Sequence, residues 1–257
     1  RNPSRAPRLP DCEPRPFSYS DFELAREALQ GVDALFMVSA AESPTREQEH
    51  LTLVRAAQAA GIQHLVYLSF AEARPDSTFT LARTHAATEE AIRRSTMKYT
   101  FVRDNFYSEL IARLADDEGV ICGPAEQGRV ACVAQRDVAQ AVTNIMADIA
   151  AGGTQHQGRT YTLTGSQALS MEDVARILTT CTGRPHRFHN ETMTEAFASR
   201  RAAYPDTPDW EIEAWVSTYT AIAKGELAQV TQDLPRLIGR APLTFEQVVR
   251  ELANPGA

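Results

Sequence analysis

Apolar runs of strand length alternate with helix-like segments through the first half of the chain. Residues 33–39 (DALFMVS), 64–69 (HLVYLS) and 99–103 (YTFVR) are almost continuously apolar. Because they lack the apolar–polar alternation of a strand with one wet face, they predict parallel strands that are covered on both faces. Capping and periodicity predict helices between them, over 45–61 and 82–95. Short links between these elements are typical of an α/β, doubly wound parallel sheet.

The elements on either side of this block are shorter. We expect a strand at 14–19 (PRPFSY), a helix that stops at Gly31, and a further helix from about residue 106. Beyond residue 116 we expect strands at 120–122, 129–134, 159–165 and near 184–190, a helix over 137–150, a helix with a capping box at Ser170 and Asp173, and three helices between 193 and 254.

Charge and cysteine content narrow the class of partner. With 26 basic and 33 acidic residues the formal net charge is −7, which favours neither nucleic acid nor an anionic membrane surface. The apolar runs fall far short of the roughly 20 residues that a membrane helix needs.

The four cysteines form no CxxC pair, which argues against a disulfide scaffold or a zinc site and indicates a reducing, cytoplasmic compartment. His186 and His189, three apart in a predicted strand, do not add a metal site. We therefore expect a small-molecule partner.

The ends of the apolar strands supply the candidate site residues. In an open parallel sheet, ligands bind outside the carboxyl ends of the strands. The residues at those ends are Ser39, Ala40, Ser69, Phe70, Asp104, Asn105 and Tyr107. Each one alone could equally be a loop-capping group, since hydroxyls and amides are common in turns. Lys98 begins its strand, so it is expected at the opposite end of the sheet, away from any ligand.

Three stretches carry a family resemblance: GVDALFMVSAAES at 31–43, AGIQHLVYLSF at 60–70 and HAATEEAIRRSTMKYTFVRDNFYSE at 85–109. They resemble the NmrA-like branch of the atypical short-chain dehydrogenases/reductases, close to bacterial NAD(P)H-dependent quinone reductases. The resemblance implies a Rossmann-type domain that binds NADPH, with NADH also possible, beneath a smaller C-terminal α+β lobe. It places Ser39, Ala40 and Ala41 beside the cofactor's ribose, Ser69 and Phe70 beside its nicotinamide, and Asn105 and Tyr107 between cofactor and substrate.

The resemblance also singles out His85. The tyrosine and lysine four residues apart that serve ordinary short-chain dehydrogenases are absent from the sequence. Related reductases carry a lysine fourteen residues before the position of Tyr99, and the quinone reductases carry a histidine there, which is His85 here. The resemblance therefore also implies that His85 binds the cofactor, near its nicotinamide. An imidazole with an ordinary pKa of about 6.5 suits donation of a proton or hydrogen bond to a carbonyl oxygen. The alternative is a partly exposed histidine in the first turn of a helix.

The glycine-rich dinucleotide fingerprint is missing. No GxxGxxG turn follows a predicted strand. In the family's pattern the chain would begin just after the second strand, so Arg1 would pair with the 2′-phosphate of NADPH. We then expect about 30 further residues upstream, the size of a βαβ unit, and a gap in the sheet between 14–19 and 33–39. On this reading residues 1–116 form the dinucleotide-binding domain, with strand 159–165 returning to it, and residues 117–158 and 166–257 form mainly the substrate lobe.

Hydride transfer to a quinone gives a delocalised anion, which needs less help from an acid than the alkoxide of a simple ketone does. A site without the Tyr/Lys pair therefore favours an oxidoreductase that reduces quinones or other electrophilic carbonyl compounds. We name His85, Asn105 and Tyr107 as its catalytic candidates. A non-catalytic NADP-binding sensor of the NmrA type and an isomerase or epimerase remain alternatives, and a homodimer is also left open.

Overall fold

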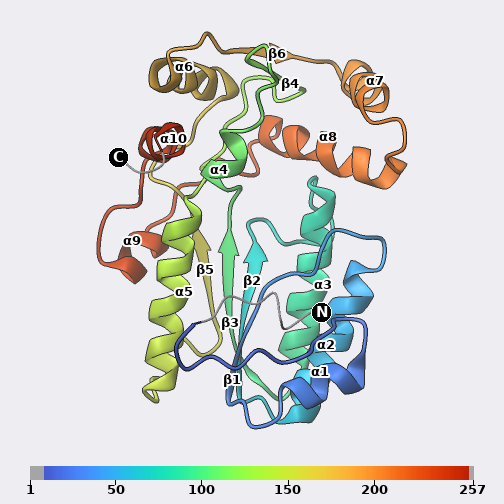
Figure 1. The fold of residues 1–257 in the computed structure, drawn as a ribbon, viewed down its shortest axis with the longest axis vertical. Helices are drawn as coiled ribbons and strands as arrows, with labels where there is room; N and C mark the ends of the chain where they lie inside the picture. The colour runs from blue at the N-terminus through green and yellow to red at the C-terminus, as the bar shows by residue number, and fades with distance from the viewer. Residues whose placement is uncertain (1–8, 255–257) are drawn as a thin grey trace.

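A four-stranded parallel sheet forms the centre of the larger part of the molecule (Figure 1). The computed structural model describes residues 9–254. The sheet has the order β1-β2-β3-β5, and its strands are β1 (Ala34–Met37), β2 (His64–Phe70), β3 (Lys98–Asp104) and β5 (Arg159–Leu163). All neighbouring strands run parallel. The predicted α/β class with a parallel sheet is confirmed.

Helices cover both faces of this sheet (Figure 1). On one face lie α1 (Phe22–Ala28), α2 (Arg46–Ala60) and α3 (Thr80–Arg94), and on the other lie α5 (Gln135–Ala150) and α9 (Asp233–Ile238). Side chains alternate along each strand, so Leu65 and Tyr67 pack toward α1–α3 while Val66 packs toward α5. Burial on both faces explains why these strands read as continuous apolar runs. Gly61 ends α2 with a φ of +87°, a left-handed conformation that glycine adopts without strain.

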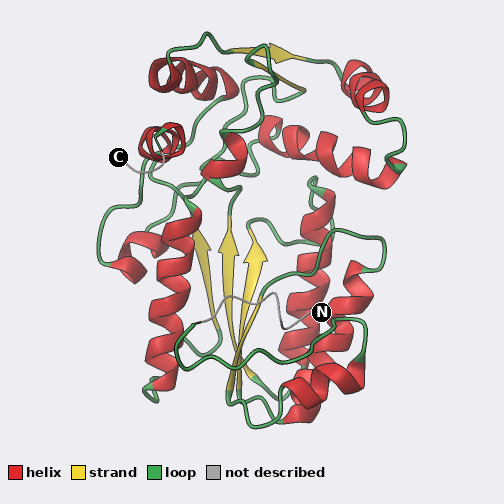
Figure 2. Ribbon diagram, viewed as in Figure 1, coloured by secondary structure: helices red, strands yellow, loops and turns green. Residues whose placement is uncertain are grey.

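A smaller lobe caps the carboxyl ends of the strands (Figure 2). It contains α4 (Ser108–Ile111), β4 (Val120–Gly123), α6 (Met171–Thr182), β6 (Arg187–Asn190), α7 (Met193–Ala203), α8 (Asp209–Ala223) and α10 (Phe245–Ala253), and β4 pairs with β6. The capping box predicted for α6 is confirmed, since Asp173 N–H donates to Ser170 Oγ and the Asp173 carboxylate accepts from Ser170 N–H. Trp215 of α8 packs against Tyr204, which follows α7, with the two ring centroids 5.2 Å apart.

Several predicted elements differ from the structure. Residues 14–19 form no strand; Phe17 and Tyr19 instead pack by their side chains on the cluster beneath α1 and α2. Residues 129–134 make only isolated bridges, and the helix expected from residue 106 is the short α4. Helix α9 lacked a clear sequence signal. The segment 135–150, expected in the lobe, packs on the sheet, because its apolar stripe contacts the outer side chains of β2, β3 and β5.

The edge strand β1 borders a groove. Within residues 9–254 no strand pairs with the outer edge of β1. Since residues 14–19 form no strand, the gap that we expected between 14–19 and 33–39 does not form. A hollow of about 500 Å³ lies there, between residues 13–19 and β1. No helix in the described part of the chain is long and apolar enough to span a bilayer.

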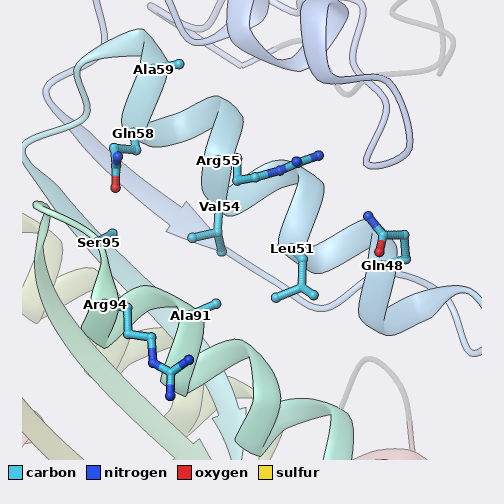
Figure 3. Close-up of a pocket in the computed structure, with 9 residues that line it drawn as sticks. All are labelled: Gln48, Leu51, Val54, Arg55, Gln58, Ala59, Ala91, Arg94 and Ser95. Atoms are coloured by element: carbon cyan, nitrogen blue, oxygen red, sulfur yellow. The ribbon is translucent and has the colours of Figure 1, made fainter.

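A separate hollow of about 470 Å³ lies between α2 and α3 on the outer side of the molecule (Figure 3). It is lined by Gln48, Leu51, Val54, Arg55, Gln58, Ala59, Ala91, Arg94 and Ser95. None of the strand-end residues named above contributes to it. The chemistry predicted from the sequence must therefore lie elsewhere.

Candidate functional site

A cavity of about 260 Å³ opens where β2 and β3 end. Seven residues expected from the sequence line it: Ser39, Ser69, Phe70, His85, Asp104, Asn105 and Tyr107. Parallel strands bring their carboxyl ends to one edge, so residues far apart in the chain meet there. Two other candidates lie outside the lining: Ala40 is buried and Ala41 is exposed. Arg1 lies outside the described residues.

The Ser69 side chain is held in place by the buried carboxylate of Glu89 on α3. Its Oγ donates to Glu89 Oε1 at 2.6 Å. Because a hydroxyl has one proton, Ser69 can only accept a hydrogen bond from a ligand in the cavity. Glu89 also accepts two hydrogen bonds from Arg103 and one from Arg93, so its charge is fully compensated.

The protonation state of His85 follows from its two partners. Arg46 Nη2 lies 3.0 Å from His85 Nε2, and the Tyr67 hydroxyl lies 2.9 Å from Nδ1. A guanidinium only donates, so Nε2 accepts and the imidazole proton is on Nδ1. Burial, reinforced by the charge of Arg46, lowers the pKa of His85 well below its ordinary value. His85 is therefore neutral here, whereas the sequence led us to expect an ordinary pKa.

Arg46 is a buried cation without an anionic partner. It is 4% exposed, lines the cavity, and forms no ion pair with any described residue. It donates hydrogen bonds to Thr84 Oγ1 and His85 Nε2, and its buried Nε has no partner among residues 9–254. Such a guanidinium can stabilise negative charge that develops beside it, and more strongly than in water because the surroundings are less polarisable.

His50 anchors the turn after β1. Thr88 Oγ1 donates to the Thr84 carbonyl, so it must accept from His50 Nδ1. Nε2 is then free to accept the Ala40 N–H at 2.8 Å. Burial, together with the charge of Arg46, lowers the pKa of His50 to about 4. The turn that carries Ser39, Ala40 and Ala41 is thus held by a neutral histidine.

The Asn105 side chain is engaged in structural contacts. Its Oδ1 accepts from Phe106 N–H at 2.8 Å, and its Nδ2 donates to the Leu227 carbonyl at 3.0 Å. Leu227 belongs to the lobe core. Asn105 therefore joins the end of β3 to the lobe. One of its amide protons remains for a ligand, since Nδ2 carries two.

Asp104 and Tyr107 line one wall of the cavity, which we call the acidic wall because it contains the Asp104 carboxyl group. Asp104 is 6% exposed, and the Tyr107 hydroxyl is hydrogen-bonded to its carboxyl group. Burial raises the pKa of Asp104 to about 7, against the weaker opposing effect of that hydrogen bond. Burial and the neighbouring Asp104 raise the pKa of Tyr107. The cavity thus holds a carboxyl group that is partly protonated at neutral pH.

Three phenylalanines form the apolar side of the cavity. The ring centroids of Phe70, Phe79 and Phe106 lie 5.0–5.1 Å apart, and the Phe70 ring lies 6.2 Å from His85. Aromatic rings pack favourably at such separations. This wall suits a flat, conjugated ligand.

Sequence reasoning missed Arg46 and did not choose Asp104 from the strand-end residues. One sequence signal does mark Arg46: it begins α2, where the positive end of the helix dipole disfavours a cation. The partly exposed histidine that we considered for position 85 is excluded by burial, because α3 begins at Thr80 and His85 is 7% exposed.

Comparisons with known proteins place this geometry in context. The model of the NmrA-like family matches residues 17–237. Quinone oxidoreductase 2 of Escherichia coli is 30% identical over 259 residues, covering 99% of this chain and 88% of that protein. A (4-alkanoyl-5-oxo-2,5-dihydrofuran-3-yl)methyl phosphate reductase of Streptomyces griseus is 32% identical, covering 92% and 82%. The crystal structure of the E. coli NADPH-dependent quinone oxidoreductase with NADPH superposes with a TM-score of 0.84 and 29% identity, covering 93% and 83%.

Proposed function

This chain belongs to the NmrA-like family, and we propose that it is an NAD(P)H-dependent reductase that transfers hydride to quinones or other electrophilic carbonyl compounds. The observation that carries the proposal is the convergence of Ser69, Phe70, His85 and Tyr107 on one cavity at the carboxyl ends of parallel strands. The names of its relatives, a quinone oxidoreductase and a reductase of a conjugated lactone, support this acceptor class.

The residues of the cavity fit the nicotinamide end of the cofactor. Ser69 can accept but not donate, which suits the N–H₂ of a carboxamide. Phe70 offers an aromatic face beside it. The described links from strand to helix contain no glycine-rich turn for a pyrophosphate. When bound, the reduced nicotinamide supplies the hydride, and NADPH is the form bound to the solved relative.

The walls of the cavity divide the remaining tasks. We propose that the three phenylalanines orient a flat acceptor and that Arg46 lies beside the acceptor oxygen on which negative charge develops. Neutral His85 keeps the guanidinium in place through its Nε2. Asn105 fixes the end of β3 against the lobe, and Tyr107 contributes its hydroxyl to the acidic wall.

Turnover with a simple quinone tests the function. On mixing the protein with NADPH and a benzoquinone, we expect the absorbance of the reduced cofactor to fall at a rate proportional to protein concentration. A mixture without protein is the control. Binding of NADPH without loss of absorbance, across quinones and conjugated lactones, would instead favour the sensor.

The role of His85 is tested by His85→Ala. Removing the imidazole frees Arg46 from one of its two recorded partners, so we expect kcat to fall about tenfold, the worth of one hydrogen bond. The Kd for NADPH, measured by fluorescence titration, should stay within about twofold. His189→Ala, at an exposed histidine in β6, is the matched control. Equal kcat in His85→Ala and wild type contradicts the role.

We also propose a cytoplasmic location and a small-molecule acceptor. The four cysteines are all free thiols, which supports a reducing compartment. Whether the chain forms a homodimer is tested by light scattering during size-exclusion chromatography, where a mass near twice 28.3 kDa indicates a dimer and a mass near 28.3 kDa a monomer.

A further inference from the structure

The acidic wall of the cavity contains a carboxyl group without a cation. Asp104 is the last residue of β3 and is 6% exposed. In the described part of the chain it forms no ion pair. Arg103 precedes it but points to the opposite face of the strand, where it binds Glu89. The Tyr107 hydroxyl lies beside its carboxyl group in the lining of the cavity.

The other titratable groups of the cavity do not neutralise Asp104. Arg46, from α2, is directed to His85 of α3. Glu42, from the link between β1 and α2, adds a negative charge to the lining, and Glu109 lies near Tyr107. An unpaired, buried carboxyl group holds its proton more tightly than an exposed one. Burial accordingly raises the pKa of Asp104 to about 7.

We propose that Asp104 is the acid that protonates the reduced acceptor, an inference that rests on the proposed reductase function. A quinone that has accepted hydride from a reduced nicotinamide is a hydroquinone monoanion. The Asp104 O–H bond breaks and its proton binds to the phenolate oxygen, which gives the neutral hydroquinone and the Asp104 carboxylate. A proton from water then restores the acid. Each turnover oxidises one reduced nicotinamide and adds one hydride and one proton to the quinone.

The proton transfer runs downhill. A phenol has a pKa of about 10, whereas that of Asp104 is about 7. Tyr107 cannot serve as the acid in its place, because burial and the neighbouring carboxyl group raise its pKa. We assign its hydroxyl, which lies beside the Asp104 carboxyl group in the cavity lining, the role of orienting that group. Tyr107 is thus a positioning residue and Asp104 the group that touches the acceptor.

Asp104→Asn tests the acid through the pH profile. With a benzoquinone and saturating NADPH, kcat of the wild type should be constant below pH 6 and fall above about pH 7, as Asp104 ionises. The variant should show a kcat about tenfold lower at pH 6 and no decline between pH 6 and 8. Asp76→Asn, on an exposed loop, should reproduce the wild-type profile. A variant with the wild-type kcat and decline overturns the proposal.

A second measurement needs neither cofactor nor turnover. The pKa of Asp104 is higher in the native state, about 7, than the 3.8 that is ordinary for an aspartate in an unfolded chain. The native state therefore binds the extra proton between these values, and the wild type loses stability as pH rises through that window. Asp104→Asn has no such proton. Between pH 5 and 8 its urea midpoint should rise relative to that of the wild type, while Asp76→Asn should track the wild type.

The two measurements separate the possible failures. If the urea midpoints of Asp104→Asn and the wild type change in parallel, Asp104 is already ionised at pH 5 and cannot be the acid. If the wild type reduces quinones and Asp104→Asn shows the wild-type pH profile of kcat, the role proposed for Asp104 is wrong and the reductase function stands. If the wild type reduces no quinone at all, the proposed reductase function is wrong, and so is the role of Asp104 as its acid.

Discussion

Replacing Glu89 with glutamine should lower the free energy of unfolding by about 3–5 kcal/mol, the usual cost of breaking a buried ion pair. Glu89 has no exposed surface. Arg103 donates to both of its oxygens, at 2.8 and 2.7 Å, and Arg93 donates to Oε2 at 2.7 Å. A glutamine amide would turn an N–H₂ group toward these guanidinium donors. Arg103, whose side chain is only 23% exposed, would lose its counter-charge.

Urea unfolding followed by circular dichroism measures this effect. The matched control is Glu90→Gln at the next position of α3, where Glu90 pairs with Arg94 on the surface at 2.7 Å. Surface pairs contribute about 0–1 kcal/mol, so this variant should unfold close to the wild type. An equal, small loss in both variants would mean that the buried network around Glu89 contributes little.

The same network connects stability with the cavity. Ser69 donates to Glu89 Oε1, and this bond leaves the Ser69 hydroxyl as an acceptor toward a ligand. The buried ion pairs of Glu89 therefore determine that Ser69 accepts, rather than donates, a hydrogen bond in the cavity.

The sequence predicted the sheet because burial on both faces leaves a direct mark. The runs at 33–39, 64–69 and 99–103 became β1, β2 and β3, with ends that differ by at most two residues. The strand at 14–19 was a wrong prediction. Its pattern of apolar and polar residues suits a strand, but no strand lies beside it in the described structure to complete a ladder.

The strand-end rule located the site without any contact information. It depends only on topology, so it brought together Ser69 at the end of β2 and two residues that follow β3, Asn105 and Tyr107. It could not supply protonation states. The pKa of His85 is lowered and that of Asp104 is raised. Both shifts favour the neutral form, because both groups are buried. Burial of a single helix or link residue is a tertiary property with no local sequence pattern.

Arg46 illustrates what tertiary structure adds. Its place at the start of α2 gains nothing from the helix dipole, and none of the described carboxylates pairs with it. What holds it is α3, through Thr84 and His85. A buried guanidinium kept at a local cost is the kind of feature that binding sites contain.

Replacing Arg46 with methionine should lower kcat/KM for a quinone about 10²–10³-fold, as the loss of one preorganised donor to developing negative charge does. The charge that hydride brings to the acceptor would then develop in an apolar cavity without a cation. Arg46→Lys keeps the charge but cannot reach Thr84 and His85 with two separate nitrogens, so it should lie between methionine and wild type. The pKa of His85 should rise in Arg46→Met, since a positive charge that lowers it is gone.

Steady-state kinetics at a fixed, saturating NADPH concentration measures this ordering, and NMR titration of the imidazole follows the pKa. Arg55→Met is the matched control, because Arg55 lies on α2 with its side chain exposed, away from the cavity. It should keep the wild-type kcat/KM. If Arg46→Met loses less than threefold, or if Arg46→Lys is no better than methionine, positive charge at this wall does not stabilise the reaction. Because circular dichroism reports folding separately, a loss of activity in a folded Arg46→Met protein is assigned to the cavity rather than to unfolding.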